Sequence, residues 1–203
     1  MRSKGMLIII SGPSGSGKGT VVRSLDRGRF SLSVSMTTRK QRPDEVDAVD
    51  YFFCTEEEFM RVRNEGGLLE HASFVGNYYG TPRFYVDEQI ALGKAVVLEI
   101  EVNGALQVKE KFPDAVLIFL IPPTRKDLRE RLIKRNTEDR ETIDDRLFRS
   151  EEELRLISRY DYLVVNDTVA NAVDLIQTIV KAESLKPHRN QYIIDRFNAG
   201  GDD

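Results

Sequence analysis

Short apolar runs recur along the chain, separated by segments in which apolar residues have helical spacing. The runs are continuous rather than alternating and rich in Val and Ile, and they lie at residues 7–10, 95–98, 116–121 and 163–165. A strand that is buried on both faces of a parallel sheet has this pattern. After the last run, one stripe of a helix is formed by Val169, Val173, Ile176 and Val180. Strands that alternate with helices predict an α/β fold with a wound parallel sheet.

Residues 31–79 interrupt this alternation. They contain short alternating or aromatic pieces at 31–36, 51–53 and 68–74, and a helix whose start at Thr55 to Glu58 fits a capping box. Thr81-Pro82 then predicts another helix start, with Thr81 as the cap and Pro82 at the first position. We interpret residues 35–93 as a small, mainly antiparallel insertion in a core made of residues 1–34, 94–123 and 158–186.

The segment 124–157 is strongly charged and has a helical pattern. Its middle, residues 135–140, has few apolar residues and predicts a turn between two helices. After Pro187 the pattern is lost, so we expect the tail 187–203 to be frayed or flexible and not catalytic.

Composition excludes several classes of protein. The 203 residues suit one domain with embellishments, and a net charge of -3 gives no overall positive field that would favour nucleic acid or an acidic membrane. Cys54 is the single cysteine, so no internal disulfide is possible, and it is better explained as a small apolar filler than as a nucleophile. No apolar run approaches the roughly 20 residues of a membrane helix. We therefore expect a cytoplasmic protein; the sequence leaves its oligomeric state open.

A glycine-rich segment directly follows the first apolar run and precedes a plausible helix. It consists of Gly12, Pro13, Ser14, Gly15, Ser16, Gly17, Lys18, Gly19 and Thr20. This spacing fits the P-loop, in which backbone N–H groups and a helix start surround a phosphate, and Lys18 would reach the β- and γ-phosphates of a nucleotide. The alternative, a glycine-rich turn with an incidental lysine, accounts less well for the strand before it and the helix after it.

One position departs from the usual P-loop, because Gly19 rather than serine or threonine follows Lys18. The hydroxyl that could bind magnesium is displaced to Thr20, so we expect Mg²⁺ to be held mostly through water and phosphate oxygens. The ending Gly-Lys-Gly-Thr resembles that of nucleoside-monophosphate kinases more than that of switch GTPases.

Further segments, in order along the chain, resemble the guanylate kinase family. They are residues 33–43, 46–51, 69–72, 76–81, 98–104, 121–123, 135–138 and 165–167, so the resemblance runs from the P-loop to about residue 183. It implies a P-loop NTPase-type parallel sheet flanked by helices, with a GMP-binding insertion and a helical lid at 124–157. It also implies transfer of the γ-phosphoryl group of ATP to GMP or dGMP, giving ADP and GDP, in purine nucleotide metabolism.

The resemblance also implies roles for residues in the insertion. The GMP phosphate would be held by Arg39, Arg42, Tyr51 and Tyr79, since arginine forks match phosphate oxygens and tyrosines add donors without charge. The guanine N1–H and amino group would donate to Glu70, helped by Glu101, while the guanine O6 would accept from Ser35 and Thr81. Glu99 and Glu101, which stand where some relatives have aspartate, complete the expected GMP-binding set.

Catalysis in such a family needs charge neutralisation rather than a general base. The second pKa of a phosphomonoester is about 6, so the attacking phosphate oxygen is already deprotonated near neutral pH. By resemblance, the catalytic cations would be Lys18, Arg42, Arg131, Arg135 and Arg146, aided by Mg²⁺, with Asn166 at the adenine edge of ATP. Asn136 departs from the family, where many members have glycine.

Two alternatives stay open at this stage. A non-catalytic, protein-binding guanylate-kinase-like domain is disfavoured because such domains tend to lose the P-loop or its lysine, and Lys18 is present. A kinase for AMP, dTMP or CMP is disfavoured because Glu70 with Ser35 and Thr81 matches guanine.

Overall fold

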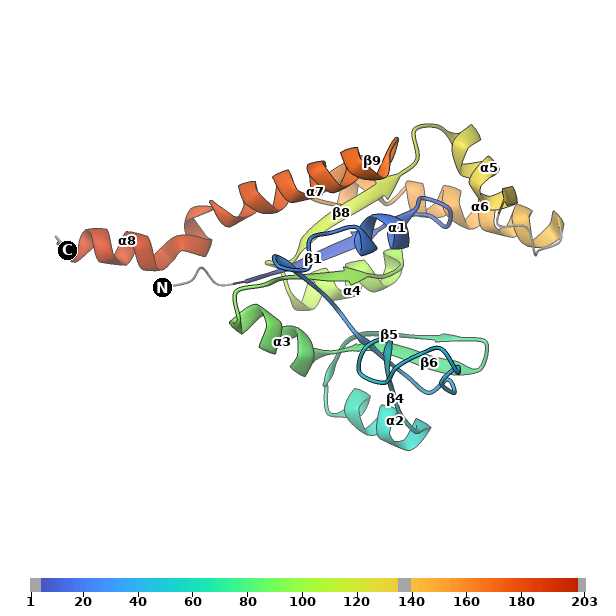
Figure 1. The fold of residues 1–203 in the computed structure, drawn as a ribbon, viewed down its shortest axis with the longest axis horizontal. Coiled ribbons are helices and arrows are strands. Elements are labelled where there is room, and N and C mark those ends of the chain that lie inside the picture. The colour runs from blue at the N-terminus through green and yellow to red at the C-terminus, as the bar shows by residue number, and fades with distance from the viewer. Residues whose placement is uncertain (1–4, 135–139, 201–203) are drawn as a thin grey trace.

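Five parallel strands form the central sheet, in the order β2-β7-β1-β8-β9 (Figure 1). The computed structural model describes residues 5–134 and 140–200. The strands are β1 (Met6–Ser11), β2 (Phe30–Leu32), β7 (Ala95–Glu99), β8 (Val116–Ile121) and β9 (Tyr162–Val165). One face packs on α1 (Lys18–Arg23) and α7 (Val169–Ser184), the other on α3 (Arg83–Ala91) and α4 (Val102–Lys111). The predicted α/β fold with a wound parallel sheet is confirmed.

Strand β1 shows why its sequence is apolar without interruption. Ile8 and Ile10 belong to the core under α1 and α7, whereas Leu7 and Ile9 belong to the core under α3 and α4. Successive side chains of a strand point to opposite faces, so a strand covered by helices on both sides needs an apolar residue at every position. The two cores hold the carboxyl end of β1 in the middle of the sheet, which fixes the position of the loop that follows.

The insertion is a second sheet with the order β4-β3-β6-β5. Its elements are β3 (Ser35–Thr37), β4 (Tyr51–Phe53), α2 (Glu56–Asn64), β5 (Leu68–Phe74) and β6 (Asn77–Pro82). Strands β3 and β4 are parallel, and the other two pairings are antiparallel. The predicted start of α2 is confirmed, because the Thr55 hydroxyl accepts a hydrogen bond from the Glu58 amide at 3.2 Å.

Two local predictions in this region are wrong. Residues 31–36 are not one continuous piece, because β2 pairs with β7 in the core sheet and β3 joins the second sheet, a division that agrees with the boundary placed between residues 34 and 35. Thr81 does not cap α3: it lies within β6, the residue before the helix is Pro82, and no side chain caps the helix start. The Thr81 hydroxyl is used elsewhere, as described below.

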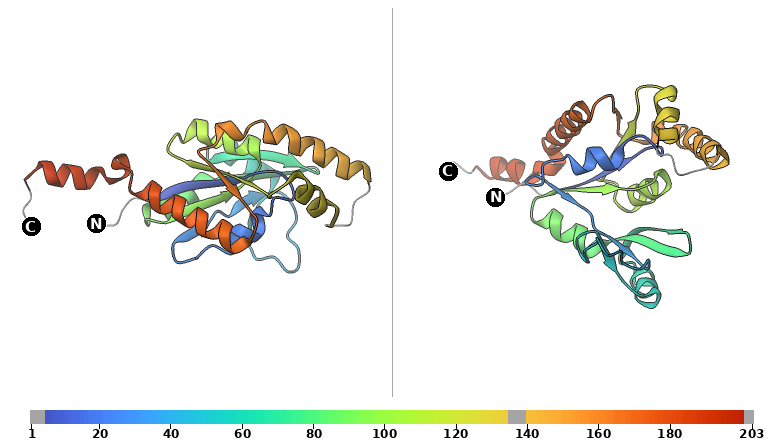
Figure 2. Two further views of the ribbon diagram at one scale, coloured as in Figure 1. Left: turned by 90° about the horizontal axis from the view of Figure 1, so that it is seen from above. Right: turned by 45° about the vertical axis from the view of Figure 1, so that its right-hand side comes forward.

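The charged segment forms α5 (Arg125–Lys134) and α6 (Arg140–Leu154), the two helices that its pattern predicts, followed by the short helix η1 (Ile157–Arg159). In Figure 1, α5 and α6 lie above the end of β1 and the insertion lies below it, and the right-hand view of Figure 2 shows the same arrangement. The loop after β1 therefore lies between the helices α5 and α6 on one side and the insertion on the other.

The C-terminal segment differs from the prediction of a frayed tail. It forms η2 (Pro187–Asn190) and α8 (Gln191–Asn198), and α8 extends away from the body of the molecule (Figures 1 and 2). Arg189 attaches the segment to the core, since its guanidinium donates to the backbone carbonyl of Asp114 at 2.7 Å and lies 3.6 Å from the Glu183 carboxylate. Among the helices of residues 5–134 and 140–200, none combines the length and apolar character needed to cross a membrane.

Candidate active site

The loop between β1 and α1 has a conformation that only glycine adopts easily. Gly12 has a φ of 145°, and a Cβ atom there would lie 2.1 Å from the backbone carbonyl oxygen of Leu120. Gly17 has a φ of 90°, and a Cβ atom there would lie 2.5 Å from the Asn166 side-chain nitrogen. Both contacts are far below van der Waals distance, so these glycines fix the path of the predicted phosphate loop.

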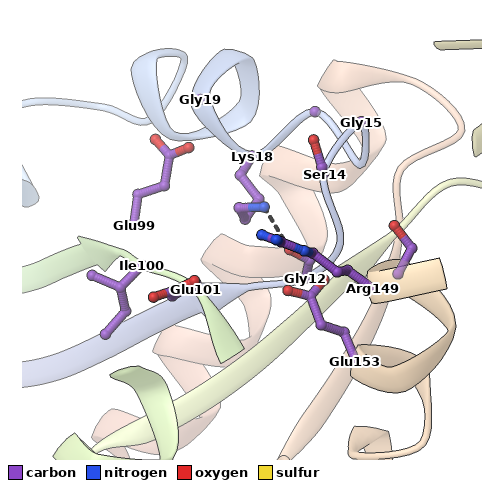
Figure 3. Close-up of a pocket in the computed structure, with 12 residues that line it drawn as sticks. Gly12, Ser14, Gly15, Lys18, Gly19, Glu99, Ile100, Glu101, Arg149 and Glu153 are labelled. Atoms are coloured by element: carbon purple, nitrogen blue, oxygen red, sulfur yellow. Dashed lines mark hydrogen bonds between the residues drawn. The ribbon is translucent and has the colours of Figure 1, made fainter. Parts of the chain in front are cut away.

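Lys18 opens α1 and points back across the loop. Its ammonium donates to the carbonyl oxygen of Gly12 (Figure 3) and, at 3.2 Å, to that of Pro13. The loop borders a pocket of about 410 Å³, which is lined by Gly12, Ser14, Gly15, Gly17, Lys18, Gly19, Glu99, Ile100, Glu101, Arg149, Ser150 and Glu153. The pocket thus combines the P-loop with the carboxyl end of β7 and with one face of α6, and it can receive an anionic group beside Lys18.

Asn166 and Arg131 support the phosphate loop from behind. Asn166 is only 4 % exposed, and its side-chain amide donates to the carbonyl oxygen of Ser16 at 2.8 Å. Arg131 donates to the carbonyl oxygens of Asn166 at 3.0 Å and of Ser16 at 3.5 Å. One N–H of the Asn166 amide is therefore used inside the protein, while its second N–H and its oxygen leave the predicted contact with an adenine edge a prediction.

Arg39 forms the centre of the predicted GMP-phosphate site. Its guanidinium lies 2.6 Å from the Glu45 carboxylate and 5.3 Å from the centre of the Tyr51 ring, and Tyr51 and Tyr79 contact each other edge to face. The other Glu45 oxygen accepts from the backbone N–H of Arg42 at 2.9 Å. The hydrogen bond between them raises the pKa of Arg39 and lowers the pKa of Glu45. Three of the four predicted phosphate ligands are thus brought together, while the Arg42 side chain is exposed at the edge of the cluster.

Glu70 is the buried acid of the insertion. It is 7 % exposed, and its carboxylate accepts from the Thr81 hydroxyl at 2.7 Å. Burial raises the pKa of Glu70, and the nearby charge of Glu101 adds to this effect. The single proton of the Thr81 hydroxyl is thus directed to Glu70 in the structure, and its predicted donation to a guanine O6 stays a prediction. Ser35 lies on the neighbouring strand β3, in register with Tyr51.

The remaining predicted residues lie around the pocket or outside the described part of the chain. Glu99 and Glu101 line the pocket, and Thr20 lies exposed in the first turn of α1. Arg135 lies outside the described residues. Arg146 belongs to α6, but its side chain is not among those described.

Three charged residues of the site were not predicted. Glu45 follows Arg42 by three residues, and this close spacing of an acid and two arginines could have suggested an internal ion pair. Arg149 and Glu153 are four residues apart on α6, so the sequence predicts that they share a helical face, but not which surface that face meets. Their position against the P-loop depends on contacts between elements far apart in the sequence.

The chain is similar to known proteins over most of its length. The guanylate kinase family model matches residues 4–183. Guanylate kinases from Oceanobacillus iheyensis and Lactococcus lactis are both 52 % identical, over 191 and 199 residues, covering 93 % and 97 % of this chain and 93 % and 96 % of their own. The crystal structure of guanylate kinase from Anaplasma phagocytophilum is 32 % identical with a TM-score of 0.70, covering 93 % of this chain and 90 % of that one. The chain therefore belongs to the guanylate kinase family.

Proposed function

We propose that the chain is an enzyme that transfers the γ-phosphoryl group of ATP to GMP, giving ADP and GDP. The observation that carries this proposal is the buried Glu70 carboxylate, held by Thr81, in the insertion that faces the P-loop pocket. Glu101 joins the two regions, because it lines the pocket beside Lys18 and also acts electrostatically on Glu70. The P-loop pocket would supply a site for a triphosphate, and the insertion would supply a site for a base with two adjacent hydrogen-bond donors.

The transfer needs no protein base. A phosphate oxygen of GMP forms a bond to the γ-phosphorus of ATP, and the bond from that phosphorus to the β–γ bridging oxygen breaks, so ADP leaves with the electron pair. The protein must hold two polyanions in line and neutralise the charge that moves between them. Lys18 serves the ATP phosphates, and Arg39 with Tyr51 and Tyr79 serves the GMP phosphate.

Selection of guanine follows from the carboxylate at Glu70. The guanine N1–H and amino group both donate to it, whereas adenine presents an unprotonated N1 that would face a buried negative charge. A site whose buried hydrogen-bonding groups are left unpaired by the wrong substrate discriminates by about 10⁴-fold or more. The ribose 2′-hydroxyl enters none of these contacts, so dGMP should also be accepted.

The donor set at the pocket suits magnesium. Mg²⁺ binds through one or two carboxylates together with substrate phosphates and water. Glu99 and Glu101 provide carboxylates beside Lys18, and the exposed Thr20 hydroxyl can act through water. When bound, the ion would neutralise phosphate charge during transfer. The substrates are thus Mg²⁺-ATP and GMP, and we expect the reaction to occur in the cytoplasm, where a single thiol such as Cys54 stays reduced.

A coupled ADP-release assay with GMP, dGMP, AMP, CMP and dTMP tests the proposal. Turnover should be confined to GMP and dGMP. Glu70→Gln should lose this preference while its affinity for ATP stays near that of the parent, and Glu65→Gln, at an exposed position in the same insertion, serves as the control. Equal or greater turnover with AMP would overturn the proposed substrate.

Lys18→Ala tests the triphosphate site in the same assay. The variant should keep its fold by circular dichroism and lose orders of magnitude in kcat, because it lacks the P-loop cation that would neutralise charge on the transferred phosphate. Lys181→Ala on the outer side of α7 is the matched control. A Lys18→Ala enzyme with near-normal kcat would mean that the P-loop pocket is not where transfer occurs.

A further inference from the structure

One face of α6 closes the side of the P-loop pocket. Arg149, Ser150 and Glu153 all line the pocket, and the spacing of four residues between Arg149 and Glu153 puts both on the same helical face. Ser150 between them is only 1 % exposed and Glu153 is half-buried, whereas Arg149 is exposed, so α6 packs at the edge of the pocket and leaves the Arg149 side chain accessible. Figure 3 shows Arg149 and Glu153 directed from α6 toward the loop that holds Lys18.

Glu153 interacts electrostatically with both cations of the pocket. Burial raises the pKa of Glu153, Lys18 and Arg149 oppose that rise, and Glu101 adds to it. Lys18 and Glu153 lie on elements separated by more than a hundred residues of sequence. The carboxylate therefore connects the helix to the loop, and it lies where it can hold the Arg149 guanidinium over the pocket.

The charges of the pocket make Arg149 important for an anionic ligand. The described lining residues include three carboxylates, Glu99, Glu101 and Glu153, but only two cations, Lys18 and Arg149. A triphosphate that enters this pocket meets a net negative lining unless a metal ion accompanies it. Loss of Arg149 would leave Lys18 as the single described cation among three acids, which should weaken binding of any polyphosphate.

We propose that Arg149 binds the phosphates of ATP in this pocket and that Glu153 is its positioning residue. The proposal rests on the proposed function for the identity of the nucleotide. A guanidinium is planar and always charged, so it can contact two phosphate oxygens at once, which a lysine at the same position cannot reproduce. The competing explanation is an ordinary helix arginine whose partner is Glu153 and whose loss changes only stability.

Calorimetric binding without GMP separates the two explanations. The probes are Mg²⁺-ATP and, to remove any contribution of the base, inorganic tripolyphosphate. We expect Arg149→Ala to weaken binding of both probes by roughly tenfold or more, and Arg149→Lys to recover part of the loss. Arg155→Ala, at an exposed position just after the end of α6 and not among the residues that line the pocket, should bind both probes like the parent. Binding by Arg149→Ala within about twofold of the parent, for both probes, would overturn the proposal.

A double-mutant cycle tests the role of Glu153. If Glu153 acts by positioning Arg149, then Glu153→Gln should weaken tripolyphosphate binding, and the double variant should be weaker by less than the product of the two single effects. If Glu153 has a purely structural role, its replacement should lower the melting temperature, and its effect on binding should be independent of the effect of replacing Arg149. That result would overturn the Glu153 assignment. These measurements need no turnover, so they stand even if the parent protein with ATP and GMP yields no GDP, a result that would contradict only the proposed function.

Discussion

Replacing Asn166 by alanine distinguishes two roles that the sequence alone leaves confounded. A residue at the end of β9 next to a nucleotide site can contact the adenine base, or it can support the phosphate loop. In the structure the Asn166 amide donates to the Ser16 carbonyl oxygen at 2.8 Å, and its nitrogen occupies the space that a Cβ atom at Gly17 would need. Asn166→Ala removes this bond and leaves the loop carbonyl in a buried position with Arg131, at 3.5 Å, as its remaining side-chain donor.

The expected size of the effect follows from burial. Asn166 is 4 % exposed, so water cannot easily replace its amide. Leaving a buried acceptor without its partner costs about 1–3 kcal/mol of folding free energy. In the variant, a phosphate ligand would have to return the loop to the conformation that the Asn166–Ser16 hydrogen bond maintains in the parent. If this costs the same 1–3 kcal/mol, the affinity for the ligand falls by roughly 5- to 150-fold.

Urea unfolding and calorimetry with two ligands provide the measurement. Support of the loop predicts that ATP and inorganic tripolyphosphate lose affinity by the same factor, because both use the loop and only one carries a base. Asn64→Ala, at an exposed position in the insertion, controls for the loss of an asparagine. If Asn166→Ala bound tripolyphosphate as well as the parent but bound ATP poorly, the base-contact role would be correct and the argument from the hydrogen bond would fail.

Three further predictions concern the acceptor site and the loop. Burial raises the pKa of Glu70 above its ordinary value of 4.5, so the protein without nucleotide loses stability as pH rises from that value. Glu70→Gln should therefore resist urea better than the parent, by a margin that grows from about pH 4 to about pH 7. A margin independent of pH would contradict this. Glu45→Gln removes the ion pair that orients Arg39 and should raise the KM for GMP roughly threefold to tenfold with little change in kcat, whereas the neighbouring exposed Asp44→Asn should change neither in steady-state assays. Gly12→Ala places a Cβ atom 2.1 Å from a backbone carbonyl and should abolish calorimetric ATP binding; a variant that binds normally would show that the loop relaxes at no cost.

The core could be predicted because its signals are local. The four apolar runs and the stripe along α7 each depend on the spacing of residues within one element, and that spacing records which faces are covered. The P-loop was recognised for the same reason, since its glycines are required by backbone geometry that the spacing itself determines. Gly12 and Gly17 illustrate this, because each adopts a positive φ next to another part of the chain.

Pairing between distant segments could not be predicted in the same way. Residues 31–36 look like one piece, yet Ser31 and Leu32 pair with β7 whereas Met36 pairs with β6. Thr81-Pro82 has the local sequence of a helix start, but strand pairing brings Thr81 next to Glu70, and the hydroxyl bonds there instead. The spacing of Ile193 and Phe197 is helical and could have predicted α8. Both side chains are exposed in the structure, so this spacing does not mark a face that packs on the core.

The two anion sites share a principle that explains where specificity arises. Arg39 forms an ion pair with Glu45, and Lys18 and Arg149 act electrostatically on Glu153, so carboxylates of the protein influence cations at both sites. A phosphomonoester carries between one and two negative charges near neutral pH, about twice the charge of a carboxylate, and can therefore compete for these cations in water. That exchange is the same for every nucleoside monophosphate and cannot distinguish one base from another. Under the proposed function we therefore expect discrimination to come from Glu70, whose buried carboxylate would accept from the two adjacent donors of guanine.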